Sequence, residues 1–138
     1  MAKERDYREL RAWQEAMELA EVVYKVTAGF PAEERFGLVA QLRRAAVSVP
    51  SCLAEGNARS STRDYLRFVA MAAGSLAEMR TQLILATRLG FLSSDLSDPT
   101  LRQLGHVTLL VQALRKALAA KLTAPSRSPF PVPCSRST

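Results

Sequence analysis

The residues best suited to bind a partner are arginines on either side of a loop at residues 56–61. These candidates are Arg43, Arg59, Arg63 and Arg67, and the cations Arg115 and Lys116 follow further along the chain. Guanidinium groups bind phosphate oxygens through paired hydrogen bonds, and clustered cations are typical of nucleic-acid surfaces. The acids near the loop are Glu55 and Asp64. We therefore interpret the cations as a candidate nucleic-acid interface.

A polar stripe at helical spacing is the second candidate. Its members within residues 41–56 are Gln41, Arg44, Ser48, Ser51 and Glu55, which lie opposite an apolar stripe. Small hydroxyl groups are unlike an ordinary Glu/Lys solvent face, so we interpret the stripe as a surface that meets another chain. Pro50 and, on the facing helix, Glu78 belong to the same candidate surface. The alternative is structural: Arg44 pairs with Glu55 or Glu78 inside one bundle, and the loop arginines are freer to bind.

A proline stands in the middle of this stripe. Because Pro50 lacks a backbone N–H, the carbonyl group of Ala46 loses its helical partner. We therefore expect the second helix to be kinked at this point.

Catalysis is not expected from this sequence. His106 is the only histidine, and no other histidine or cysteine stands at the spacing that a metal site or a catalytic pair needs. Neither a glycine-rich phosphate loop nor a Gly-x-Ser-x-Gly motif is present. We therefore interpret His106 as structural and predict no enzyme, no catalytic residue, no metal, no cofactor and no small-molecule substrate.

The positive charge is concentrated towards the C-terminal end. The chain has 19 basic and 13 acidic residues, which give a net charge of +6 at pH 7. Residues 99–138 contain no acid, and their basic residues are Arg102, Arg115, Lys116, Lys121, Arg127 and Arg136. Such an end attracts nucleic acid or an acidic partner, or it serves only solubility. The sequence leaves both interpretations open.

The elements that carry these residues are helices. Alanine and leucine dominate over β-branched residues, which favours helix over strand. Apolar periodicity and end signals predict four helices at about residues 7–28, 32–56, 61–90 and 98–122. We expect one all-α domain, a four-helix bundle over residues 1–123, followed by a proline-rich tail.

Several helix ends and core faces follow from the same signals. Asp6 is expected to cap the first helix with Glu9 as its capping-box partner. Ser61 is expected to cap the third helix and Asp98 the fourth. The predicted core stripe of the first helix is Leu10, Trp13, Met17, Ala20 and Tyr24, and that of the second is Val39, Leu42, Ala46, Val49 and Leu53. The last two helices are apolar over more than one face, which favours self-association over a merely broad core.

The C-terminal tail, 124–138, cannot be helical. Its prolines are Pro125, Pro129, Pro131 and Pro133, so we expect an extended segment. The first residues of the chain are charged and lack the apolar run of a signal peptide, and no segment approaches the roughly 18 apolar residues of a membrane span. Cys52 and Cys134 stand far apart without a CxxC motif, which is typical of reduced thiols. We therefore expect a cytoplasmic protein.

Several short motifs together resemble one bacterial protein family. They are Leu10 to Trp13 with Tyr24, Phe30-Pro31, Glu34-x-Phe36-Gly37-Leu38, Gln41-Leu42-Arg43-Arg44-Ala45-Ala46-Val47-Ser48, Pro50-Ser51, Ala54-Glu55-Gly56 and Gly74-Ser75-Leu76-x-Glu78. Over about residues 7–122 the chain looks like the four-helix-bundle proteins encoded in intervening sequences of 23S ribosomal RNA genes. That family includes relatives of the accessory protein of diversity-generating retroelements. One departure is Cys52, where the family usually has asparagine, and the tail lies outside the pattern.

The resemblance implies a fold, an assembly and a class of partner. The implied fold is an antiparallel up-down-up-down four-helix bundle, and the implied assembly is a ring-shaped homopentamer without enzymatic activity. The retroelement relative works with a reverse transcriptase and RNA through a basic surface. The resemblance therefore also implies association with RNA, DNA or a nucleic-acid-binding protein. The alternative partner is a polypeptide, which would make the ring a protein–protein scaffold or adaptor with no nucleic-acid role.

Overall fold

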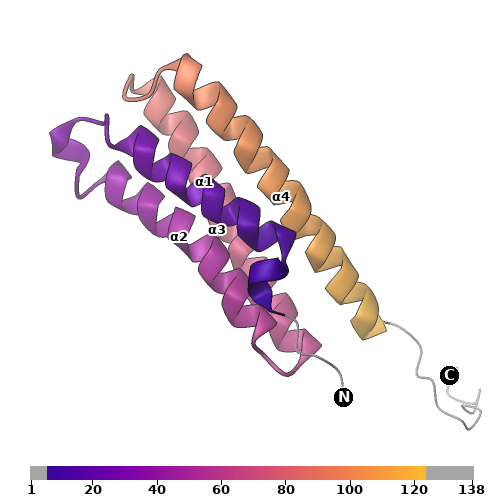
Figure 1. Cartoon of the computed structure of the whole chain (residues 1–138). Coiled ribbons are helices and arrows are strands. Elements are labelled where there is room, and N and C mark those ends of the chain that lie inside the picture. The colour runs from indigo at the N-terminus through magenta and orange to yellow at the C-terminus, as the bar shows by residue number, and fades with distance from the viewer. Residues whose placement is uncertain (1–5, 124–138) are drawn as a thin grey trace, which may run out of the picture.

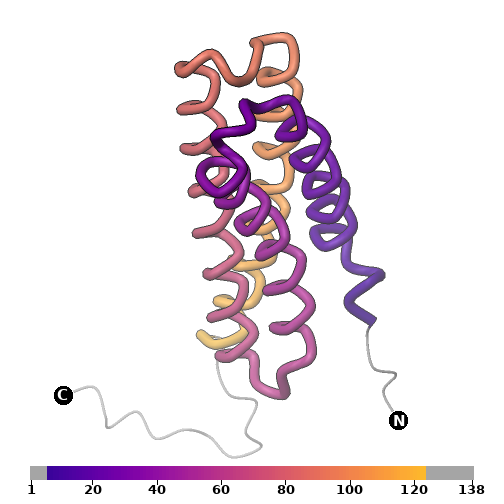
Figure 2. The backbone as a smooth tube through the Cα atoms, turned by 90° about the vertical axis from the view of Figure 1, so that its left-hand side faces the viewer, coloured from indigo at the N-terminus to yellow at the C-terminus, as the bar shows by residue number. Residues whose placement is uncertain are grey.

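The computed structural model describes residues 6–123, and this part of the chain forms helices without any strand. Four α-helices form an antiparallel up-down-up-down bundle, in which each helix packs on the next and α1 also packs on α4 (Figure 1). The α2–α3 turn lies at one end, and the α1–α2 and α3–α4 connections lie at the other (Figure 2). The predicted fold class is confirmed. The predicted extended tail, 124–138, lies outside the described residues.

The first predicted helix is split in two. A short 3-10 helix, η1 (Tyr7–Glu9), precedes α1 (Arg11–Thr27), and Leu10 between them is extended, with φ −74° and ψ 120°. The carboxylate of Asp6 caps η1 by accepting a hydrogen bond from the backbone N–H two residues on, at 2.9 Å. The predicted continuous helix with a Glu9 capping box is wrong. The N–H of Glu9 instead bonds the carbonyl of Asp6, three residues back, at 3.0 Å, which closes a 3-10 turn.

The buried face of α1 also differs from the predicted one. Its buried residues are Ala12, Ala16, Leu19, Val23 and Thr27. Two members of the predicted stripe, Met17 and Tyr24, keep 40% and 44% of their surface exposed. The prediction is wrong because it followed the large residues Trp13, Met17 and Tyr24, whereas the buried stripe lies one position earlier along the helix. The alanines let neighbouring helices approach closely, and the larger side chains lie on the flank, where Tyr24 contacts Arg43 of α2.

The second α-helix, α2 (Leu38–Asn57), buries the whole of its predicted apolar stripe. It starts later than predicted, because a second 3-10 turn, η2 (Ala32–Glu34), comes first. The side chain of Glu34 then accepts a hydrogen bond from the N–H of Leu38 at 3.1 Å, which satisfies one free donor at the start of α2. Pro50 is buried inside the helix. The kink expected there stays a prediction.

The third α-helix, α3 (Thr62–Arg88), begins as predicted and ends at a glycine. The Ser61 hydroxyl accepts a hydrogen bond from the N–H of Asp64 at 3.0 Å. At the other end Gly90 has φ 81°, and the next N–H along the chain donates to the carbonyl of Ala86 at 2.9 Å. This is a Schellman cap, and it uses a left-handed residue because glycine adopts that conformation without strain.

The fourth α-helix, α4 (Ser94–Thr123), starts earlier than predicted. The carbonyl of Ser93 accepts the N–H of Ser97 at 2.8 Å, so helical bonding begins before Asp98. Pro99 consequently lies inside the helix instead of at its first position. The prediction is wrong because the chain is already helical before it reaches Pro99, whose missing N–H would have bonded the carbonyl of Asp95.

The helices α2 and α3 approach each other closely at Gly56. A Cβ atom placed there would lie 2.9 Å from Cβ of Phe68 and 2.9 Å from Cδ1 of Tyr65. Both neighbours stand in the first turns of α3, and Phe68 is buried. This contact therefore accommodates only a residue without a side chain.

Replacing Gly56 by alanine is expected to destabilise the bundle by about 1–3 kcal/mol, because the added methyl group overpacks a closed interface. Gly105→Ala is a matched control, since the nearest atom to its added Cβ is the mobile end of Arg80, at 3.4 Å. That helical substitution should be neutral or stabilising by up to about 1 kcal/mol. Urea unfolding followed by circular dichroism measures both variants. Equal stability of the two would contradict the packing argument.

Candidate nucleic-acid interface and assembly face

Most of the predicted cations gather at one end of the bundle. Because α3 and α4 are antiparallel, the α2–α3 turn and the last turns of α4 lie at the same end (Figures 1 and 2). We call the exposed cations of the α2–α3 turn, the start of α3 and the last turns of α4 the basic end, and they are Arg59, Arg63, Arg67, Arg115, Lys116 and Lys121. From the sequence, Lys121 was named only within the basic excess of residues 99–138 and not among the candidate binding residues. The predicted antiparallel bundle could have identified it, because antiparallel pairing of α3 with α4 puts the last turn of α4 beside the first turn of α3.

The ring of Phe68 holds two of these arginines in place. The guanidinium carbons of Arg59 and Arg67 each lie 4.8 Å from the centre of the ring, which is buried. Arg59 also pairs with Glu55 at 3.3 Å, and Arg67 with Asp64 at 3.8 Å. Exposed contacts of these two kinds contribute about 1 kcal/mol or less each. They restrict the two side chains without withdrawing them from the surface.

The other cations of the basic end have no ionic partner among residues 6–123. Arg63, Arg115, Lys116 and Lys121 form no salt bridge in that range. Arg63 stands in the first turn of α3, where the helix dipole is positive as well. The basic end thus combines restrained guanidinium groups with cations that are available to an anion.

Arg43 does not lie at the basic end. It is half-buried beside the end of α1, where its Nε donates to the Thr27 hydroxyl at 3.0 Å and its Nη2 to the carbonyl of Tyr24 at 3.2 Å. Its guanidinium group also lies 4.5 Å from the centre of the Tyr24 ring. Because the last carbonyls of a helix lack partners within it, Arg43 caps α1. The structure therefore separates this arginine from the other predicted binding residues.

The inner edge of the predicted polar stripe joins α2 to α3 within one bundle. The hydroxyl oxygens of Ser48 and Ser75 lie 2.9 Å apart. Further along the pair, the side-chain amide of Gln82 donates to Oε1 of Gln41 at 3.5 Å. The Oε1 atom of Gln82 is the one buried side-chain nitrogen or oxygen of residues 6–123 without a hydrogen bond. This edge is structural.

The outer edge of the stripe remains open. The structural alternative required Arg44 to pair with Glu55 or Glu78, but Glu55 pairs with Arg59 instead. Arg44, Ser51 and Glu78 are exposed. Within the described part of the chain neither Arg44 nor Glu78 forms a salt bridge. Opposite charges therefore stand on this edge without pairing inside the bundle.

Exposed apolar side chains share the outer edge. Val47 lies one turn beyond Arg44, while Met71 and Leu85 each lie two turns from Glu78, so helical spacing puts them on the same side. Val47, Met71 and Leu85 keep 45%, 49% and 45% of their surface exposed. We call this surface the assembly face, and it consists of Arg44, Val47, Ser51, Met71, Gly74, Glu78 and Leu85.

The only histidine of the chain links α1 to α4. Its Nε2 atom lies 2.9 Å from Oε1 of Glu15. Nε of Arg11 donates to Oε2 of the same carboxylate at 2.7 Å. The hydrogen bond from Arg11 lowers the pKa of Glu15 below its ordinary value, and the nearby His106 acts in the same direction. These contacts connect two helices and give His106 a structural position.

Residues 6–123 offer neither a metal site nor a membrane span. No group of three or more histidine, cysteine, aspartate or glutamate side chains in this range is arranged to hold a metal ion. None of the helices there is both long enough and apolar enough to cross a membrane.

Comparison with known protein families shows which family the bundle belongs to. The family of the 23S rRNA-intervening sequence protein matches residues 8–113, which span α1, α2, α3 and most of α4. The chain belongs to this family. The match includes the α2–α3 turn and the assembly face, and it confirms the resemblance drawn from the sequence motifs. The relation to the retroelement accessory protein stays a prediction.

A solved structure has the same fold. It is a crystal structure from Bacteroides thetaiotaomicron of a protein with unknown function from the S23 ribosomal protein family. It superposes with a TM-score of 0.69 at 17% identity, covering 76% of this chain and 98% of that chain. At this identity the likeness shows the fold alone. No curated protein matches the chain.

Glu15→Gln is expected to destabilise the bundle at neutral pH and to have little effect in acid. The folded-state pKa of Glu15 lies below its ordinary value of 4.5, so its ion pair stabilises the fold above that value. The stabilisation is lost as the pH falls through the lowered pKa. Urea unfolding of both proteins over a pH series measures the difference. Glu18→Gln, an exposed change on the same helix, is the control, and a difference independent of pH would contradict the linkage.

Proposed function

We propose that this protein is a non-enzymatic, cytoplasmic helical-bundle subunit that assembles with copies of itself and binds nucleic acid or a nucleoprotein at its basic end. One observation carries the proposal. Cations from two segments far apart in sequence, the α2–α3 turn and the end of α4, converge at one end of the bundle. A homopentameric ring, which the family resemblance implies, would present five such ends to one partner.

The composition of the basic end suits a phosphate backbone. Arg63 has no ionic partner among residues 6–123, so its guanidinium group can bind phosphate oxygens without first breaking a salt bridge. Arg59 and Arg67 are already restrained by Phe68, which lowers the entropy lost when they bind. Because Phe68 is itself buried, it does not offer a face on which a base could stack. We therefore propose binding that depends on charge rather than on base sequence.

The start of α3 adds to the attraction for phosphate. A helix N-terminus carries a partial positive charge and N–H groups without helical partners. Here that terminus lies within the basic end, next to Arg63. The two acids that flank the α2–α3 turn, Glu55 and Asp64, are each paired with an arginine, so they oppose an incoming phosphate only weakly.

The assembly face supports self-association. It carries both signs of charge, in Arg44 and Glu78, so copies related by rotation can pair them between subunits. Its centre is open, since nothing lies within 4 Å of a Cβ atom placed on Gly74. A second helix can therefore approach α3 closely there, between exposed Met71 and Leu85.

One observation favours a polypeptide partner as the second candidate. Leu109 on the outer side of α4 is 70% exposed, the largest exposure among the leucines of the described residues. An apolar side chain of this kind contributes to a protein contact and not to phosphate binding. A protein–protein scaffold or adaptor is therefore the alternative function.

Arg63→Ala combined with Arg67→Ala is expected to weaken binding of a single-stranded RNA about ten-fold or more at low salt, because two phosphate contacts are lost. Binding by the unmodified protein should fall steeply with salt. The double variant should reduce the slope of log K against log salt by about 1.4, which corresponds to two single-strand phosphates. Fluorescence anisotropy of labelled RNA measures both quantities.

Arg88→Ala with Arg102→Ala is the matched control, since it removes the same charge from exposed residues near the other end of the bundle. Equal losses in the two double variants would show that only net charge matters. A partner affinity that does not change with salt concentration would favour the scaffold alternative instead.

Ser51→Glu is expected to dissociate the assembly, because it buries an unpaired carboxylate between subunits. Gly74→Leu should act in the same way by filling the open centre of the assembly face. Ala113→Glu, which adds a carboxylate at an exposed position of α4, is the control. Native mass spectrometry measures the subunit number. Unchanged masses for Ser51→Glu and Gly74→Leu would exclude this face as the interface.

A further inference from the structure

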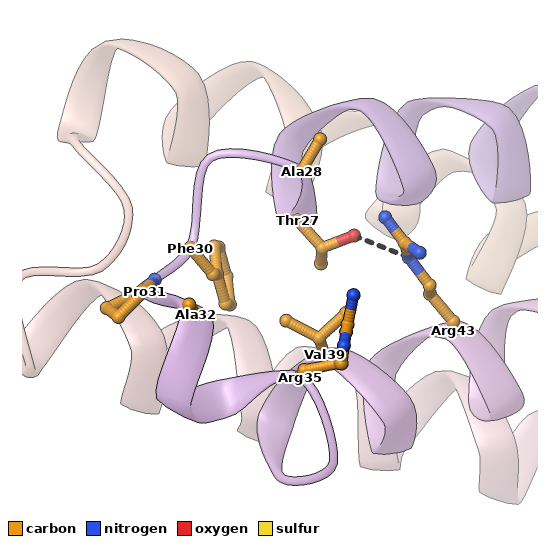
Figure 3. Close-up of a pocket in the computed structure, with 8 residues that line it drawn as sticks. All are labelled: Thr27, Ala28, Phe30, Pro31, Ala32, Arg35, Val39 and Arg43. Carbon is orange, nitrogen blue, oxygen red and sulfur yellow. Dashed lines mark hydrogen bonds between the residues drawn. The ribbon is translucent and has the colours of Figure 1, made fainter.

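A cavity lies near the end of the bundle opposite the basic end. It is formed by the end of α1, the α1–α2 connection and the start of α2, and its volume is about 420 Å³ (Figure 3). Cavities of roughly 300–1,000 Å³ are typical of small-molecule sites. Two arginines, Arg35 and Arg43, line it together with Thr27 and an apolar wall that includes Phe30 and Val39. Nothing in the sequence indicated this site.

One guanidinium group in the cavity is held rigidly. The Nε atom of Arg43 donates to the Thr27 hydroxyl at 3.0 Å, and its Nη2 atom donates to the carbonyl of Tyr24 at 3.2 Å. The Nη1 atom makes no such bond and is free. The Thr27 hydroxyl in turn donates to the carbonyl of Val23 at 2.7 Å. These bonds pre-organise Arg43, so a ligand that binds Nη1 does not have to order the side chain.

The second guanidinium group is free. The side chain of Arg35 makes no hydrogen bond or salt bridge with any residue of the range 6–123. Figure 3 shows it directed into the space between α1 and α2, on the same side as the guanidinium group of Arg43. One restrained and one unrestrained positive charge thus line the same cavity.

No acidic side chain lines the cavity. The acid next to Arg35 in sequence, Glu34, is bonded to the N–H of Leu38 at the start of α2. The side chains that face the cavity therefore offer hydrogen-bond donors in excess and no carboxylate acceptor. A negatively charged ligand rich in hydrogen-bond acceptors would match these donors.

We propose that this cavity, which we call the anion pocket, binds an organic phosphate monoester. Its phosphate accepts hydrogen bonds from Arg35 and from Nη1 of Arg43, and its apolar or aromatic carrier packs on Phe30, Pro31 and Val39. A phosphate monoester carries close to two negative charges at neutral pH, which matches two guanidinium groups, whereas a carboxylate carries one. The inference is independent of binding at the basic end.

Phenyl phosphate is the probe, titrated into the unmodified protein and followed by amide NMR shifts and calorimetry. We expect saturable binding with a Kd on the order of 1 mM or tighter, with shifts at Thr27, Phe30 and Val39. Arg35→Gln should weaken binding about ten-fold or more, because charged hydrogen bonds are lost from an exposed side chain that makes no hydrogen bond or salt bridge within residues 6–123. Arg88→Gln, an exposed arginine outside the pocket, should leave the Kd unchanged.

Three related ligands distinguish the contribution of the phosphate charge from that of the apolar carrier. Inorganic phosphate should bind more weakly, since it lacks the apolar carrier, and phenol should not bind, since it lacks the charge. Benzoate binding as tightly as phenyl phosphate would overturn the assignment of a phosphate monoester. The proposal also fails if phenyl phosphate causes no saturable shift in the pocket up to about 10 mM, or if Arg35→Gln leaves its Kd unchanged. Arg43 is not used as the test variant, because its loss also removes the cap of α1.

Discussion

The close approach of α2 to α3 determines where the basic end and the assembly face lie. Gly56 brings the end of α2 against Phe68, and the hydroxyl groups of Ser48 and Ser75 meet at 2.9 Å further along the pair. Two helices in contact at both points cannot slide without losing packing and a hydrogen bond. The register that results places Arg59, which follows α2, on the ring of Phe68 in α3.

Arginine has several different roles in this small protein, and the surroundings of each side chain decide between them. Arg43 bonds the last turn of α1 and also faces the anion pocket. Arg59 is restrained by a ring and a carboxylate at the surface. Arg63 has neither kind of partner among residues 6–123 and stands at a positive helix start. A count of positive charge would treat all three alike, although only some are available to a nucleic acid.

The proposed surfaces are compatible within one assembly. The basic end lies at the α2–α3 turn, the anion pocket lies beside the α1–α2 connection, and the assembly face runs along α2 and α3 between these ends (Figures 1 and 3). Subunits joined through the assembly face would therefore leave the pocket and the basic end accessible. The pair of Glu15 and His106 lies on a further surface, where α1 meets α4. Self-association, nucleic-acid binding and binding of an organic phosphate thus need not compete for the same residues.

Sequence alone was enough for features that act within one helix. The core stripe of α2 and the cap of Ser61 on α3 are correct because periodicity and end bonding involve near neighbours only. The sequence also predicted most of the cations of the basic end, since several of them cluster near one loop. The tertiary structure decided the buried face of α1, because Ala12 and Ala16 are chosen by how closely other helices approach. It also decided the separate position of Arg43 and the presence of the anion pocket. Those depend on contacts between residues far apart along the chain, which no local pattern records.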